Sequence, residues 1–184
     1  MNDAIIEAAL ALAPGMGWNR AMLARAAGDA ALAENAFPAG ARDAIAAWSR
    51  LADARMGAAA EAENLAALRI PARIRRVVAI RLEQATPHKA ALREALAVLA
   101  LPWNAPLAAR LTAQTVSAMW YAAGDTSADF SWYTRRATLA AIYGATLAYW
   151  LRDPSLGLDN TLAFLDRRMV DHARLSRAIP RKAA

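Results

Sequence analysis

The side chains best suited to chemistry gather in one short polar stretch, residues 124–136, which reads GDTSADFSWYTRR. It holds two carboxylates, three hydroxyl groups, two adjacent aromatic rings and two adjacent arginines. Asp125 and Asp129 stand four residues apart, so on a helix they would share a face, as a catalytic pair of carboxylates must. These carboxylates could instead have a structural role, as helix caps beside the neighbouring hydroxyl groups or as ion-pair partners of Arg135. The stretch therefore favours a structured polar corner over a catalytic site.

No second group completes an active site around that corner. The two histidines, His88 and His172, are far apart in the sequence, and no Glu-x-x-His pair is present. The absence of cysteine excludes a thiolate nucleophile, a disulfide and a zinc–thiolate site. A serine nucleophile at Ser127 or Ser131 would depend on a distant histidine as its base. The sequence therefore predicts a protein that is not an enzyme, with no catalytic residue, no metal and no cofactor.

Two helices are expected to flank this corner and fix its position. Gly124 is a suitable helix stop, because glycine adopts a left-handed cap without steric cost. Polar residues after it can cap a new helix that begins near residue 131. This helix would carry Trp132 and Tyr133 on its first turn. Trp132 lies at helical spacing from Leu139, which favours a buried core position; aromatic rings beside arginines are also typical of a protein-binding patch.

The rest of the chain is typical of an all-α protein. Its 184 residues are 58% hydrophobic, with alanine abundant and β-branched residues sparse. This length suits one domain, or a small N-terminal unit joined to a larger one. Apolar spacing and Pro/Gly breaks predict nine helices: 4–12, 19–27, 31–37, 42–62, from 71, from 87, from 102 to 123, 131–151 and 160–178.

Residues 124–153, GDTSADFSWYTRRATLAAIYGATLAYWLRD, and residues 161–168, TLAFLDRR, resemble the coenzyme Q biosynthesis accessory protein nine family. Members of that family share the fold of TetR-type regulators, bind lipids and assist the di-iron hydroxylase that acts late in ubiquinone synthesis. The resemblance implies a TetR-like helical bundle of about nine helices, as a homodimer. It divides the chain into a helix–turn–helix-like head, 1–48, and a helical lipid-binding domain, 49–184.

The head poses the question of DNA binding, because the spacing of its second and third helices resembles the reading head of TetR-type regulators. A reading helix needs cations for phosphates and long donors for base edges. The expected reading helix, 31–37, has no lysine or arginine and carries Glu34, and Asn35 is its one residue suited to a base. These residues disfavour DNA as a partner. A TetR-type transcriptional regulator with an apolar effector pocket stays as the alternative function.

The resemblance also implies two sets of site residues. Large side chains among many alanines would by themselves be ordinary core, but the family implies a pocket for an isoprenoid quinone or a phospholipid lined by Met119, Trp120, Leu139, Ile142, Tyr143, Leu147 and Trp150. The family further implies a surface that binds the demethoxyubiquinone hydroxylase, made of Asp129, Trp132, Tyr133 and Arg136. The protein would present a polyprenylated ubiquinone precursor there. An interaction protein with no pocket is the third alternative.

Charge and hydropathy predict a cytoplasmic protein, peripheral on the inner face of the membrane. No segment has the length of a membrane span, and the opening residues are acidic where a secretory signal would be basic. The net charge is +6. Eukaryotic members of the family carry a further amphipathic helix, whereas this chain ends in a basic cluster that would contact an anionic membrane surface: Arg167, Arg168, Arg174, Arg177, Arg181 and Lys182.

Overall fold

A computed structural model describes residues 2–125 and 131–178 of the chain, and over these ranges every regular element is helical. Three short 3-10 turns, η1 (Leu65–Ala67), η2 (Thr86–His88) and η3 (Pro102–Asn104), join longer helices. The α-helices of the described ranges are α1 (Asn2–Met16), α2 (Arg20–Ala27), α3 (Ala30–Ala36), α4 (Ala41–Ala62), α5 (Ile70–Ala85), α6 (Lys89–Leu99), α7 (Ala105–Ala122), α8 (Ser131–Arg152) and α9 (Asp159–Ala178). The expected all-α bundle is confirmed.

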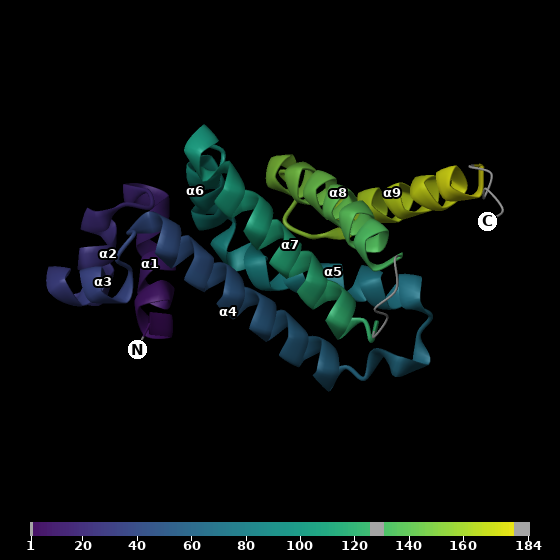
Figure 1. Cartoon of the computed structure of the whole chain (residues 1–184), viewed down its shortest axis with the longest axis horizontal. Coiled ribbons are helices and arrows are strands. Elements are labelled where there is room, and N and C mark those ends of the chain that lie inside the picture. Colours follow the sequence, from purple (N-terminus) through teal and green to yellow (C-terminus); the bar gives the residue numbers. More distant parts are fainter. Residues whose placement is uncertain (1, 126–130, 179–184) are drawn as a thin grey trace.

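The helices form a small head and a larger body, and α4 belongs to both (Figure 1). Helices α1, α2 and α3 lie together at one end of the molecule. From there α4 runs along the body, where it packs against α5 and α7. Helices α8 and α9 pair with each other at the far end. Helices α1 and α9 consequently lie at opposite ends of the molecule.

Two apolar cores correspond to these two parts. In the head core, Trp18 stacks on Trp48 with ring centroids 5.6 Å apart. The indole N–H of Trp18 also donates a 3.0 Å hydrogen bond to the carbonyl of Ala91, which ties the head to α6. The body core begins at Met56 on the same helix, α4. The proposed boundary at residue 48 therefore falls inside a continuous helix, and the division at that residue stays a prediction.

One expected helix end is wrong. Pro14, with the glycines that follow it, was expected to stop the first helix near residue 12, but α1 continues through Pro14 to Met16. Proline removes one backbone donor and its ring crowds the preceding turn, but here these effects do not stop Gly15 and Met16 from continuing the helix. Gly17 then terminates α1 with a φ of +68° and bonds back to the carbonyl of Ala13 at 2.8 Å.

The head has the helix–turn–helix geometry that the sequence predicts, but Arg20, the cation beside α3, already binds other groups of the protein. Asp29 caps α3 by accepting a 2.7 Å hydrogen bond from the amide of Leu32. Arg20 pairs with Glu34 of α3 at 3.2 Å and donates to the carbonyl of Pro38 at 3.0 Å. The guanidinium is thus shared with protein acceptors, which reduces its availability for phosphate contacts.

Candidate functional site: an apolar groove beside an aromatic corner

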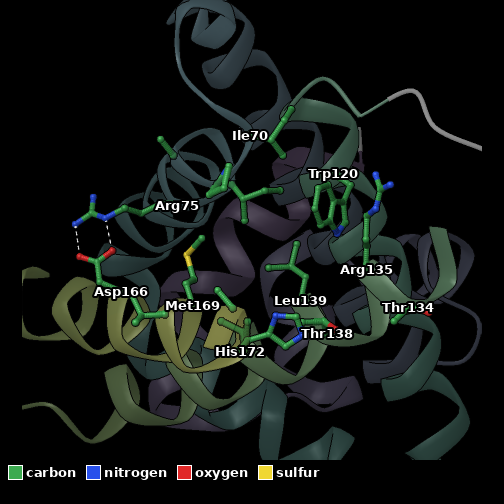
Figure 2. Close-up of a pocket in the computed structure, with 16 residues that line it drawn as sticks. Ile70, Arg75, Trp120, Thr134, Arg135, Thr138, Leu139, Asp166, Met169 and His172 are labelled. Carbon is green, nitrogen blue, oxygen red and sulfur yellow. Dashed lines mark hydrogen bonds and ion pairs between the residues drawn. The ribbon is translucent and has the colours of Figure 1, made fainter. Parts of the chain in front are cut away.

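A groove of about 640 Å³ lies between α5, α8 and α9, with Trp120 of α7 at one end (Figure 2). Its wall surface is mostly apolar, although Thr134, Thr138 and His172 also line it. Figure 2 shows Ile70, Trp120, Leu139 and Met169 around the space. Pockets of about 300–1,000 Å³ with apolar walls are the usual size for small-molecule and cofactor sites. The groove can therefore hold an extended apolar molecule.

Charged pairs stand at the margins of this groove. Arg75 of α5 binds Asp166 of α9 through two hydrogen bonds of 2.6 and 3.0 Å. These bonds to Asp166 raise the pKa of the Arg75 guanidinium above its usual range. Toward the Trp120 end, Arg135 lies 3.4 Å from Asp125. The pairing expected between Asp125 and Arg135 is therefore present, and the charges lie at the margins of the groove.

Of the seven residues predicted to contact lipid, the structure brings three together in the groove: Trp120, Leu139 and Ile142. Tyr143 and Leu147 line a different, smaller pocket. Met119 and Trp150 are buried in the body core and line neither cavity. Successive residues of a helix point about 100° apart, so one apolar run on α8 supplies two cavities and a core. Contact between these residues and a lipid stays a prediction.

The aromatic corner lies at the start of α8. Trp132 is half-buried: its ring meets that of Tyr133 edge-on at 4.7 Å, and the guanidinium of Arg136 covers it at 3.8 Å from the ring centroid. Tyr133 is 72% exposed. Arg136 also donates a 3.3 Å hydrogen bond to Ser117 of α7. Trp132 therefore has both a packed face and an accessible one; Asp129, the fourth residue of the predicted partner surface, lies outside the described residues.

The arginines of α5 have a structural role that sequence reasoning missed. Arg69, Arg73 and Arg76 recur at helical spacing, which by itself favours a solvated stripe or a contact with lipid phosphates. Instead, Arg76 pairs with both Glu63 and Glu83 at 2.6 Å. Arg73 donates to three carbonyls, those of Leu68, Ala66 and Ala123, at 2.7, 2.6 and 3.3 Å. Glu63 before α5 and Glu83 near its end were the available signal for Arg76, but the carbonyl partners of Arg73 cannot be predicted from side-chain spacing.

Replacing Arg73 with methionine is expected to destabilise the body by about 2 kcal/mol, because charged donors to carbonyls contribute about 1.5–3 kcal/mol each when well ordered and less when partly solvated. The melting temperature should fall by about 4–8 °C, as measured by circular dichroism. Arg69→Met is the matched control, since Arg69 is exposed at the start of the same helix. Equal melting temperatures for the two variants would contradict a clamping role for Arg73.

The basic C-terminal cluster is only partly described. Arg168 pairs with Asp171 at 2.7 Å, and both Arg167 and Arg168 lie within 6 Å of the ring of Phe164. Arg181 and Lys182 lie outside the described residues. In the described part of the chain no helix is long and apolar enough to cross a bilayer, and no three histidine, aspartate or glutamate side chains gather into a metal site there.

Comparison of the fold identifies the class first. The chain superposes on the TetR transcriptional regulator from Nitrosomonas europaea ATCC 19718 with a TM-score of 0.76 and 26% identity, covering 95% of this chain and 98% of the other. It is thus a TetR-like all-α protein with an apolar groove in its body.

Sequence comparison then identifies the family. Residues 105–176 match the family model described as COQ9, a stretch that holds α7, α8 and most of α9. The ubiquinone biosynthesis protein COQ9 of Homo sapiens is 42% identical over 98 residues, and that of Drosophila melanogaster is 33% identical over an alignment of 183 residues that covers 93% of this chain. The chain carries a COQ9 domain, as its motif implied. The matched stretches span 31% and 55% of those two relatives, whose names describe them as mitochondrial.

Proposed function

We propose that the protein is a non-enzymatic lipid-binding accessory protein of ubiquinone biosynthesis. It holds a polyprenylated quinone precursor and presents it to the demethoxyubiquinone hydroxylase. The observation that carries this proposal is an apolar groove of about 640 Å³ formed largely by helices of the COQ9 domain. Trp120, Leu139 and Ile142 would contact the prenyl chain, while the groove's charged margins stay hydrated.

Energetics require the protein to do more than provide an apolar surface. Moving about ten methylene-sized groups from water into the groove is worth roughly 8 kcal/mol. Taking the same chain from a bilayer gains almost nothing, because lipid tails are already apolar. Net transfer therefore depends on shape, on contacts with the quinone ring, or on delivery to a partner. Docking to the hydroxylase is accordingly part of the mechanism.

The contacts between groove and corner support such a delivery. The amide of Asp125 donates a 3.0 Å hydrogen bond to the carbonyl of Trp120, at one end of the groove. The carboxylate of Asp125 lies 3.4 Å from Arg135, which lines the groove, and 3.8 Å from Arg136, which covers Trp132. A partner that binds at Trp132 would therefore contact Arg136, which is linked through Asp125 to residues that line the groove.

Extraction of the purified protein for mass spectrometry tests the ligand. An isoprenoid quinone or its precursor is expected to co-purify, and a phospholipid would support lipid binding without the quinone. A protein that carries no apolar molecule and takes up none from vesicles would overturn the proposal. Sedimentation of the same sample tests the proposed homodimer, and flotation with anionic vesicles at low and high salt tests the proposed peripheral contact with a cytoplasmic membrane face.

The solved TetR relative favours a second candidate, a transcriptional regulator whose body senses an apolar effector. Against it, α3 carries no cation, and Arg20 is paired with Glu34. A gel-shift assay with genomic fragments decides between the two. A retarded fragment whose binding weakens when the groove is filled would establish the regulator.

A further inference from the structure

A second cavity of about 340 Å³, here called the inner pocket, lies on the other side of α8 from the groove. The two cavities share no lining residue: Ile142 lines the groove, and Tyr143, the next residue, lines the inner pocket. Its walls come from α4, α5, α6, α7 and α8. They are mainly apolar, with Trp48, Leu92, Leu96, Leu99, Leu111 and Leu147 the largest apolar contributors.

A buried polar cluster closes one side of this pocket. Thr115 donates a 2.9 Å hydrogen bond to Asp53, and Arg81 lies 3.4 Å from the other oxygen of the same carboxylate. The side chains of Arg81 and Asp53 are 13% and 10% exposed. Burial raises the pKa of the Asp53 carboxyl, although the charge of Arg81 opposes the shift. Buried polar groups need partners, yet Arg81 Nε and Asp53 Oδ1 form no hydrogen bond of ordinary geometry in the described structure.

Tyr143 adds a third polar group to the same pocket. Burial raises the pKa of its phenol, so the hydroxyl stays protonated and can donate at neutral pH. Both Arg81 and Asp53 are near enough to influence that pKa. Among the described residues the Tyr143 hydroxyl has no hydrogen-bond partner. A donor without a partner inside an apolar cavity is the feature that typically fixes the orientation of a small ligand.

The balance of charge selects the kind of ligand. Arg81 and Asp53 together carry no net charge when both are ionised, so an anion would have to lose its hydration without a free cation to replace it. An uncharged molecule with carbonyl or ether oxygens meets no such cost. The geometry points to a second binding site, in which Tyr143 and Arg81 donate hydrogen bonds to a compact, uncharged, oxygenated ring whose apolar edges fill the leucine-lined walls. A benzoquinone ring belongs to this class, and the inference does not require the groove to bind lipid.

Fluorine NMR of protein labelled with fluorotryptophan can separate the two cavities, because Trp48 lines the inner pocket and Trp120 lines the groove. The six tryptophan signals are assigned by single Trp→Phe substitutions. The probe is a dimethoxy-methyl-benzoquinone without a prenyl chain; the chain has no cysteine with which it could form an adduct. We expect this probe to shift the Trp48 signal and to leave that of Trp120 unchanged.

Tyr143→Phe removes only the hydroxyl and is expected to weaken binding of the probe about five- to twentyfold, the effect of one hydrogen bond to a buried site. The melting temperature should not fall, because no described residue forms a hydrogen bond with that hydroxyl. Tyr149→Phe is the matched control: it lies on the same helix, stacks on Phe164 at 4.6 Å and lines neither cavity. Its binding should equal that of the unchanged protein.

Three results would overturn the inference. The first is a Trp48 signal that does not shift at any soluble concentration of the quinone. The second is an affinity for the quinone that is unchanged by Tyr143→Phe. The third is tighter binding of methoxybenzoate, a charged ring of similar size, than of the quinone. Squalene, a prenyl hydrocarbon without oxygen, serves as the groove probe and should shift Trp120 alone. If squalene does not shift Trp120 while the quinone shifts Trp48, the result would count against lipid binding in the groove and would still support the inner pocket.

Discussion

Ile142→Lys is expected to reduce the retention of isoprenoid lipid by about 10- to 100-fold. Ile142 is half-buried and lines the groove on α8. A lysine there would either place its ammonium among apolar walls or stretch it across the mouth toward water. Leaving a polar group without a partner costs about 1–3 kcal/mol, and every 1.4 kcal/mol is a tenfold change in affinity. Because Ile142 is not fully buried, the fold itself should survive.

The measurement is the amount of lipid that co-purifies, followed by titration with a fluorescent isoprenoid analogue. Ala141→Lys is the matched control, since Ala141 is exposed, adjacent on the same helix and lines neither cavity. Both variants carry the same added charge, so a difference between them reports the groove alone. Equal lipid content in the two variants would exclude the groove as the binding site.

Trp132→Ala is expected to weaken binding to the hydroxylase by about 30-fold or more, the effect of losing about 2 kcal/mol at the centre of an interface. The physical reason is that Trp132 is held in place on one side by Arg136, at 3.8 Å, so its remaining face is ordered before binding. An ordered aromatic ring loses little conformational entropy when a partner covers it. Surface plasmon resonance with the purified hydroxylase provides the affinity.

Trp103→Ala is the control for removing a tryptophan from the surface. Trp103 is 69% exposed in η3, and no cation or ring covers it in the described structure. We expect this change to leave the affinity for the hydroxylase unaltered. If Trp132→Ala instead lowers the melting temperature sharply while affinity is unchanged, Trp132 acts as core, which was the other interpretation of its spacing.

The helices and their order followed from the sequence, because alanine-rich amphipathic segments between Pro and Gly breaks are a local property of the chain. The resemblance to the COQ9 family was likewise recognisable from residues 124–153 and 161–168. The end of α1 was less predictable, because a proline weakens a helix without fixing the residue at which that helix ends.

Only the tertiary structure decided which large apolar residues line a cavity and which lie only in the core. Leu139, Tyr143 and Trp150 all lie on α8 and all belong to the body core, yet Leu139 also lines the groove, Tyr143 also lines the inner pocket and Trp150 lines neither. The sequence by itself determined that α8 has large apolar side chains on several faces. Which face meets a cavity depends on the positions of α5, α7 and α9, and therefore on contacts between residues far apart in the chain.

The same reason applies to the polar groups. Asp53, Arg81 and Thr115 come from three separate helices, and nothing in their spacing along the chain indicates that they meet. Hydrogen bonds and ion pairs act over a few ångströms, so their partners are set by packing and not by sequence distance. The sequence determined an all-α COQ9-type chain with an aromatic corner; packing alone decided that it encloses two chemically different cavities.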